Sequence, residues 1–337
     1  MRPRPAQMHR RTTWNYSSYS LELFKGAIVR REVVRGVAMV AWLSVVRGFA
    51  LLVLAALATV PFHTQPARAV DEIQLYNAEI ADVGQFTIQH HFNYAFSGRK
   101  EPDFPGGLTP NHALNATPEF AWGITEWFEL GLYIPWAIDS EGRFLSNWFK
   151  FRTLFVTPDA EKKNFFYGLN FEYDYTAPRF SETRFAMEIR PIIGWRNPQW
   201  ELIVNPIVDI GFGSRGDVDF VPAARLARTF SKDFALGVEY YTDLGRPGSF
   251  LPFQQQSHQL FGVVDFKVGV VDVDFGIGYG LTEGSDRWIA KTILTYAFPV
   301  AGKQEDTTGI KAPPTMKASM RQTSAVQLAS DPFAGIR

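Results

Sequence analysis

The sequence contains no cysteine, so neither a disulfide bond nor a thiolate metal site is available to it. Positive and negative side chains balance, with 34 Lys plus Arg against 34 Asp plus Glu. This balance gives no indication of a nucleic-acid partner. The sequence also lacks a phosphate-binding glycine loop and a zinc motif. We therefore expect no cofactor, no metal and no nucleic acid.

Long apolar runs are also scarce, and the clearest one covers residues 48–60. Basic residues precede this run, and the small-residue site Ala67-Arg68-Ala69 follows it, which is the order found in a secretory signal peptide. We predict that residues 1–69 are a signal peptide and that the mature chain begins near Val70. The basic region is unusually long, and Met39 would begin a signal peptide of ordinary length, so we expect that residues 1–38 come from a misassigned start. The alternative is an uncleaved membrane helix over 37–60, which Arg47 interrupts.

Residues 164–175, NFFYGLNFEYDY, alternate between two kinds of side chain. The odd positions are aromatic or aliphatic, and most even positions are small, amide or acidic. Successive side chains of a β-strand point to opposite faces, so this period of two predicts a strand with one apolar face. A tilted strand crosses a bilayer with roughly 9–11 residues, and this stretch is long enough.

The same alternation recurs from residue 84 to residue 298. It predicts about twelve strands, at 85–96, 114–124, 128–136, 145–155, 164–175, 184–194, 200–210, 218–230, 234–244, 259–268, 271–281 and 288–298. Short connections, such as 231–233, alternate with longer ones, such as 97–111 and 245–257. These features predict an all-β fold, a closed antiparallel transmembrane β-barrel of the outer-membrane type. Aromatic residues make up 15% of the chain, while its mean hydropathy is slightly negative, as an apolar outside and a polar inside require.

A soluble β-sandwich or lipocalin-like barrel shows the same alternation. Its water-facing side, however, would be rich in Lys and Glu, whereas the polar face here carries Gly, Asn, Thr and isolated charges. Aromatic residues at predicted strand ends suit the interfacial girdles of a membrane barrel; they are Trp122, Trp136, Trp200, Trp288 and Tyr296. The membrane barrel is therefore favoured.

Charged residues on the polar faces are the candidates for lining the lumen. The set comprises Glu119, Glu129, Lys150, Arg152, Glu172, Asp174, Arg184, Glu188 and Arg190. One interpretation is a water-filled passage whose charged wall filters solutes. The other is a set of ion pairs that only neutralises a narrow interior. Acids outnumber bases on the polar faces overall, which favours cations.

A catalytic barrel, such as a lipase, needs a serine and a histidine together on the outer face of a strand. His90 falls on the apolar face of its predicted strand, but that strand contains no serine. We therefore expect no enzyme activity and assign no catalytic residue. Residues 299–337 show no period and are rich in Ser, Thr, Pro and Lys, which predicts a disordered periplasmic tail after the aromatic Phe298.

The segment EFAWGITEWFELGL at 119–132 resembles a hairpin that recurs in Gram-negative outer-membrane barrels. It is most similar to the transporter-like family named for the meta-pathway of phenol degradation, through Gly123, Ile124, Thr125, Glu126, Glu129 and Gly131. Residues 231–237 echo the same turn. The resemblance implies an outer-membrane location and uptake of small solutes, including aromatic or other organic ones.

We thus expect a passive channel whose partners are outer-membrane lipid, the barrel-assembly machinery during insertion, and small solutes. The alternative is a structural or adhesive barrel with a plugged lumen. The two differ in whether residues 102–107 and 250–256 fold into the mouth of the barrel.

Overall fold

The computed structural model describes residues 72–300. The predicted signal peptide, the predicted start of the mature chain and nearly all of the predicted tail lie outside the described residues. The strands are β1 (Phe86–Ser97), β2 (Leu114–Thr125), β3 (Phe128–Tyr133), β4 (Trp136–Ile138), β5 (Phe144–Ser146), β6 (Phe149–Val156), β7 (Phe165–Tyr175), β8 (Phe185–Arg196), β9 (Trp200–Asn205), β10 (Val208–Gly211), β11 (Val218–Phe220), β12 (Ala223–Ser231), β13 (Phe234–Asp243), β14 (Ser257–Val268), β15 (Val271–Gly280) and β16 (Trp288–Ala297). One short 3₁₀ helix, η1 (Ala160–Lys162), lies between β6 and β7.

These sixteen strands form twelve barrel strands, because four of the twelve are each interrupted once. β3 and β4 both pair with β2, and β9 and β10 both pair with β8. Three of the four interruptions contain a proline, namely Pro135, Pro206 and Pro222. Proline has no N–H to donate to a neighbouring strand, so the ladder breaks there while the chain keeps its direction.

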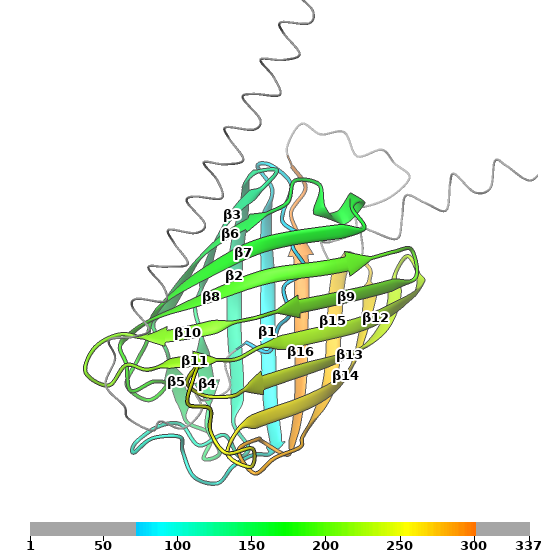
Figure 1. The fold of residues 1–337 in the computed structure, drawn as a ribbon. Helices are drawn as coiled ribbons and strands as arrows, with labels where there is room; N and C mark the ends of the chain where they lie inside the picture. Colours follow the sequence, from blue (N-terminus) through cyan, green and yellow to red (C-terminus); the bar gives the residue numbers. More distant parts are fainter. Residues whose placement is uncertain (1–71, 301–337) are drawn as a thin grey trace, which may run out of the picture. The chain divides into compact units, whose positions relative to one another are not determined.

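The sheet closes on itself, because β1 pairs with β2 on one side and with β16 on the other. Figure 1 shows the cyan β1 beside the orange β16, which joins the two ends of the described chain. All pairings are antiparallel, and closure through β1 leaves the sheet without a free first or last barrel strand. The predicted closed antiparallel barrel of twelve strands is confirmed. All predicted strand ends lie within two residues of the ends of the twelve barrel strands, and the prolines account for three of the four interruptions.

The outward face of the barrel is apolar. In β7, Phe165, Tyr167 and Tyr173 are exposed, while the alternate side chains Phe166 and Glu172 are buried inside. Exposed aromatic and aliphatic side chains recur on all twelve barrel strands, and they include the predicted girdle residues Trp122, Trp200 and Trp288. Such a belt is stable only against lipid, so the barrel is an outer-membrane barrel.

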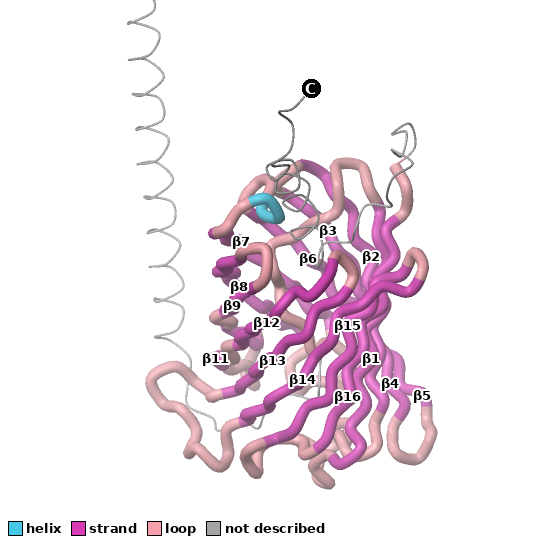
Figure 2. The backbone as a smooth tube through the Cα atoms, turned by 90° about the vertical axis from the view of Figure 1, so that its right-hand side faces the viewer, coloured by secondary structure: helices cyan, strands magenta, loops and turns pink. Residues whose placement is uncertain are grey.

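The two ends of the barrel differ. Short turns and η1 lie at the top of Figure 2, and longer loops lie at the bottom. In the turn between β14 and β15, Gly269 has φ +61°, a value that glycine adopts without strain. Outer-membrane barrels place short turns in the periplasm and long loops outside the cell, which orients this barrel. Within residues 72–300, no helix is both long and apolar enough to cross a bilayer.

Candidate functional site

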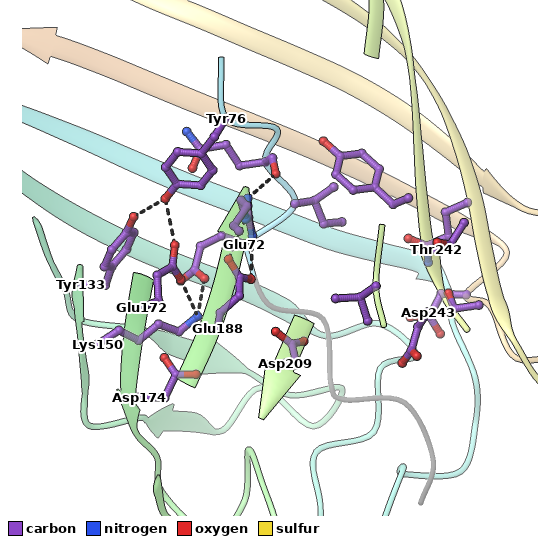
Figure 3. A pocket seen from close by; sticks show the side chains of 18 of the residues that line it. Glu72, Tyr76, Tyr133, Lys150, Glu172, Asp174, Glu188, Asp209, Thr242 and Asp243 are labelled. Atoms are coloured by element: carbon purple, nitrogen blue, oxygen red, sulfur yellow. Dashed lines mark hydrogen bonds and ion pairs between the residues drawn. The ribbon is translucent and has the colours of Figure 1, made fainter. Parts of the chain in front are cut away.

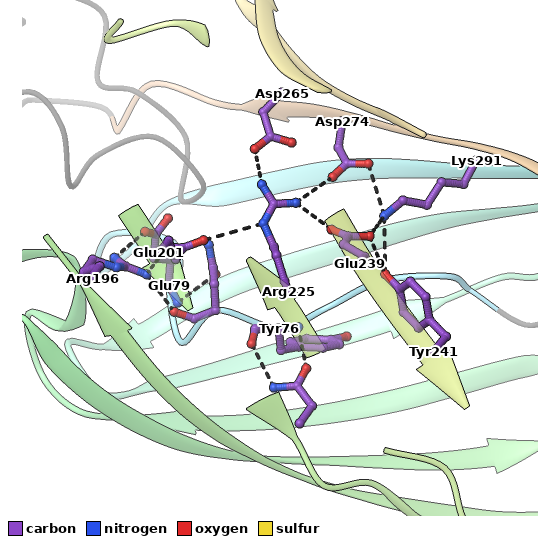
Figure 4. A network of polar contacts seen from close by, with 12 residues as sticks. Tyr76, Glu79, Arg196, Glu201, Arg225, Glu239, Tyr241, Asp265, Asp274 and Lys291 are labelled. Carbon is purple, nitrogen blue, oxygen red and sulfur yellow. Dashed lines mark hydrogen bonds and ion pairs between the residues drawn. The ribbon is translucent and has the colours of Figure 1, made fainter. Parts of the chain in front are cut away.

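The interior of the barrel is occupied by residues 72–83, here called the lumen segment. Tyr76 lies at its centre and is buried. The N–H of Tyr76 donates to Oδ1 of Asn205 (2.8 Å), and Nδ2 of Asn205 donates to the carbonyl of Tyr76 (3.1 Å). The Tyr76 hydroxyl donates to Oε1 of Glu172 (2.9 Å) and shares a hydrogen bond with the Tyr133 hydroxyl (2.5 Å). Figures 3 and 4 show these contacts, which fix the lumen segment to β3, β7 and β9.

Ion pairs fix the remainder of the lumen segment along the barrel axis. Glu72 accepts from Lys150 at 2.6 Å near the loop end, and Glu79 accepts from Arg196 at 2.7 Å near the turn end. The N–H of Ala81 donates to Oε2 of Glu129 at 2.6 Å. Both partners of each ion pair are nearly excluded from solvent. The charges are therefore matched between the segment and the wall, as burial of charge requires.

An apolar patch on the wall faces the lumen segment. Leu154, Phe166, Ile192 and Ile203 point inward from neighbouring strands and pack with Tyr76 and Ala78. These positions would be polar in an empty water-filled barrel. Their burial shows that the interior of the barrel is shaped around the segment.

Gly123 allows the chain to enter the lumen beside the end of β2. A Cβ atom at this position would lie 2.3 Å from the carbonyl oxygen of Asp82 and 2.5 Å from that of Ala81. The Gly123 carbonyl also accepts from the N–H of Gly84 at 2.7 Å. The hairpin glycine noted in the sequence thus serves a close backbone approach.

Charges on the wall form two clusters. In the Arg152 cluster, the guanidinium of Arg152 pairs with Glu119 (2.9 Å) and with Glu129. Nε2 of His91 lies 3.1 Å from Oε2 of Glu119, and the guanidinium lies over the Tyr133 ring, 5.8 Å from its centroid. This cluster holds β1, β2, β3 and β6 together on the inside.

The Arg225 cluster, shown in Figure 4, holds four carboxylates around two cations. Its members are Arg225, Lys291, Glu201, Glu239, Asp265 and Asp274. Arg225 pairs with Glu239 at 2.5 Å and lies 3.5 Å from Asp274, which is 3.3 Å from Lys291. Acids therefore outnumber bases inside this part of the wall.

Two of the cavities inside the barrel follow one another along its axis. The larger, of about 180 Å³, reaches toward the loops; the smaller, of about 70 Å³, reaches toward the turns. Gln74 and Tyr76 line both cavities and therefore separate them. The charged residues around the larger cavity are seven acids, Glu72, Glu172, Asp174, Glu188, Asp209, Asp243 and Asp286, and three bases, Arg99, Lys150 and Arg190. Figure 3 shows this cavity.

Eight of the nine residues predicted to line the lumen point inward, namely Glu119, Glu129, Lys150, Arg152, Glu172, Asp174, Glu188 and Arg190. Strand register places Lys150 beside Asp174 and Arg152 beside Glu172, and Arg190 pairs with Glu188 at 2.6 Å. Arg184 is placed differently. It is exposed, precedes the first residue of β8, and lies over the Trp148 ring at 5.5 Å. Strand alternation does not extend to it, because the strand begins one residue later.

The lumen segment and its anchors Tyr133, Arg196 and Asn205 were not predicted from the sequence. The available signal was weak: residues 72–83 carry Ile73, Leu75, Tyr76 and Ile80 without any strand period. The mouth loops that were considered as plugs do not line the two cavities. Neither 102–107 nor 250–256 contributes a residue to the lining of either cavity.

The loop after β1 is instead tied to the loop before β16. Arg99 pairs with Asp103, and its backbone N–H donates to Oδ1 of Asp286 at 2.7 Å. Burial raises the pKa of Asp103 to about 6, although the charge of Arg99 opposes the increase. These contacts hold the loop over the rim, outside the membrane-spanning strands.

The histidines occupy unrelated surroundings. His90 stacks on Phe92 on the outward face with 4.2 Å between ring centroids, whereas His91 points inward to Glu119. The ring of His258 bonds with Tyr240 (2.6 Å) and Gln256 (2.8 Å). Residues 72–300 contain no group of three or more acidic or histidine side chains placed to hold a metal ion.

Solved structures with a similar fold are outer-membrane barrels. The COG4313 outer membrane channel from Pseudomonas putida F1 is 12% identical, with a TM-score of 0.49, over 67% of this chain and 100% of that chain. The NanC porin is 6% identical, with a TM-score of 0.42, over 63% of this chain and 98% of that chain. The outer membrane channel DcaP of Acinetobacter baumannii is 9% identical, with a TM-score of 0.31, over 68% and 100%. At these identities and TM-scores the similarities carry no conclusion about this chain.

No family model matches the chain, and no curated protein matches it. The family named from the hairpin at 119–132 is therefore not confirmed.

Proposed function

We propose that the barrel is a passive outer-membrane channel for small solutes and that it favours cations. The observation that carries the proposal is the larger cavity, around which seven acids face three bases. Most of these charges are paired, yet an excess of four carboxylates gives the cavity a negative potential. Such a potential concentrates cations and repels anions.

The proposed route runs from the loop end through the larger cavity, past Gln74 and Tyr76, into the smaller cavity and on toward the turns. The proposed constriction of this route lies beside these two side chains of the lumen segment, because both line the two cavities. A cavity of about 180 Å³ has room for several waters. With the lumen segment in place, the channel therefore suits ions and solutes of a few heavy atoms.

The polar lining supports passage because an ion that leaves bulk water needs replacement ligands. Carboxylates and the hydroxyls of Tyr76 and Tyr133 supply them along the wall of the larger cavity. Uptake of organic solutes, which the hairpin resemblance implies, would use the same route with hydroxyl and amide hydrogen bonds.

The experiment is a measurement of ion selectivity for residues 70–337 reconstituted in a planar bilayer under a KCl gradient. The reversal potential should indicate preference for K⁺, and the double variant Glu172→Gln, Asp174→Asn should reduce that preference. Glu126→Gln is the matched control, because Glu126 is exposed in a turn outside the lumen. A reversal potential that favours Cl⁻ would overturn the cation preference. A folded barrel without conductance would overturn the channel and leave the structural barrel.

A further inference from the structure

The outward face of the barrel carries a single formal charge. Outward positions are identified by strand alternation and by the register of neighbouring strands. Among all outward positions of the described strands, Arg228 on β12 is the only Lys, Arg, Asp or Glu. Its neighbours in register are Trp200 on β9 and Leu236 on β13, which are exposed like Arg228 itself.

Two aromatic rings bracket the guanidinium of Arg228. It lies 5.6 Å from the centroid of the Trp200 ring and 5.1 Å from that of Phe230. Within residues 72–300 no carboxylate pairs with it, whereas the inward-facing Arg225 of the same strand and Arg196 of β8 both have acidic partners. Cation–π contacts orient the side chain, and they leave its N–H donors available.

Arg228 lies close to the periplasmic end of its strand. β12 ends at Ser231, and a short turn leads to Phe234, whose ring lies 6.0 Å from that of Phe230. Three residues of strand span roughly 10 Å, and a long arginine side chain reaches several ångströms further toward the interface. A charge at this depth is tolerated, whereas one at the bilayer midplane is strongly disfavoured. The guanidinium therefore reaches the level of lipid headgroups.

We propose that Arg228, held between Trp200 and Phe230, binds the phosphate of a phospholipid in the inner leaflet of the outer membrane. A guanidinium presents paired N–H donors that match two phosphate oxygens, and it remains charged at any physiological pH. The rings of Trp200 and Phe230 exclude water from the two sides of the guanidinium, which strengthens the ion pair. The acyl chains of the bound lipid extend from the headgroup toward the middle of the membrane, along the apolar outward face of the strands.

A second copy of the chain would not supply the missing anion. On the described strands, no outward position carries a carboxylate, so a barrel packed against this face would offer only uncharged side chains, a histidine or a second Arg228. Two unpaired arginines repel each other. A lipid phosphate is the anion that this depth of the membrane supplies in abundance.

The test is native mass spectrometry of the folded protein in a detergent without phosphate, titrated with phosphatidylglycerol. Wild type should retain one more lipid than Arg228→Gln, with roughly tenfold tighter binding, as loss of a charge-assisted hydrogen bond predicts. Arg228→Lys, which keeps the charge but loses the paired donors, should be intermediate. Lys232→Gln is the matched control, because Lys232 lies at the same end and is exposed in the turn. Heat-modifiable migration in gels confirms that each variant is folded.

The proposal is overturned if folded Arg228→Gln retains as many lipids, with the same affinity, as wild type. A second arm adds glycerol phosphate, which has the headgroup phosphate without acyl chains. Competition by glycerol phosphate at lipid-like concentrations would show that the site takes a soluble phosphate, and that result also overturns the lipid assignment.

Discussion

The hydroxyl of Tyr76 donates a hydrogen bond to Glu172 across 2.9 Å, although the two residues are 96 positions apart in the chain. This contact joins the lumen segment to the wall of the barrel at the junction of the two cavities. It also orients one carboxylate of the acidic cavity. The position of the segment and the charge of the route are therefore coupled through one pair of residues.

Replacing Tyr76 with Phe should loosen the lumen segment. The variant loses the hydrogen bonds to Glu172 and Tyr133, which together contribute about 1–3 kcal/mol. Single-channel recordings should show more frequent steps of higher conductance, as the segment leaves its place more often. Tyr279→Phe is the control, since Tyr279 is exposed on the outward face. Identical recordings from wild type and Tyr76→Phe would contradict this role.

Gln74→Ala should widen the proposed route without releasing the segment. Gln74 lines both cavities, and its side chain donates to Gln89 at 3.2 Å, while its carbonyl holds Arg190 at 2.8 Å. Alanine removes the side chain and keeps the carbonyl contact. We expect higher conductance with unchanged step frequency. The exposed turn residue Gln199 provides the control Gln199→Ala, and a lower conductance of Gln74→Ala would argue against a constriction at this point.

Gly123→Ala should destabilise the barrel, because the added methyl group would collide with the carbonyls of Ala81 and Asp82. Overpacking of this kind costs about 1–3 kcal/mol. Urea unfolding in lipid vesicles measures the loss. Gly262→Ala is matched to it, because a Cβ at Gly262 meets no atom within 4 Å. Equal midpoints for the two variants would show that the close approach at Gly123 is unimportant.

Lys291→Met should lower the free energy of unfolding more than an exposed substitution does. Lys291 is 1% exposed and is the cation shared by Glu239 and Asp274. Removing one partner of a buried pair costs about 3–5 kcal/mol, because the remaining carboxylates lose their counter-charge. Lys291→Met combined with Glu239→Gln should recover part of the loss. The comparison is Lys232→Met in an exposed turn, and a loss no larger than in that variant would count against a buried network.

Asp103 should make the loop at 98–111 sensitive to pH. Its pKa of about 6 in the folded loop exceeds the ordinary value of 3.8, so the folded loop binds the proton more tightly than the unfolded chain does. Its contribution to loop stability is therefore present below pH 4 and is lost as the pH rises through about 6. The charged groups that face it are Arg99, Asp286 and Asp243.

Hydrogen exchange of the loop amides, corrected for intrinsic rates, measures this effect. Protection in wild type should be greater at pH 5 than at pH 7.5. Asp103→Asn should remove the difference, because an amide does not titrate in this range. Protection in wild type that rises with pH would contradict the prediction.

Local alternation was sufficient to predict the barrel. In β7 the side chains of Phe165 and Glu172 lie on opposite faces, as a period of two requires. The lengths of the connections distinguish the end of the barrel with short turns from the end with long loops. The prolines at 135, 206 and 222 divided strands that the alternation presented as continuous. A proline alone does not reveal such a break, because Pro118 and Pro191 lie within the uninterrupted strands β2 and β8.

The contents of the lumen could not be predicted in the same way. Contacts such as that between Tyr76 and Asn205 join residues 129 positions apart, and no local period records them. Phe166 and Ile192 point inward and are apolar, against the expected polar face, because the lumen segment packs on them. Arg184 was predicted to point inward but does not. It lies one residue before β8, where strand alternation no longer determines the direction of a side chain.

The most direct test of the account compares the single-channel conductance of residues 70–337 with that of the same protein lacking the lumen segment, residues 72–83. The intact protein should conduct through the two cavities with small, stable steps, and deletion of the lumen segment should increase the conductance severalfold. An intact protein that is folded but silent, beside a deletion variant that conducts, would contradict the account, because the lumen segment would then close the barrel completely.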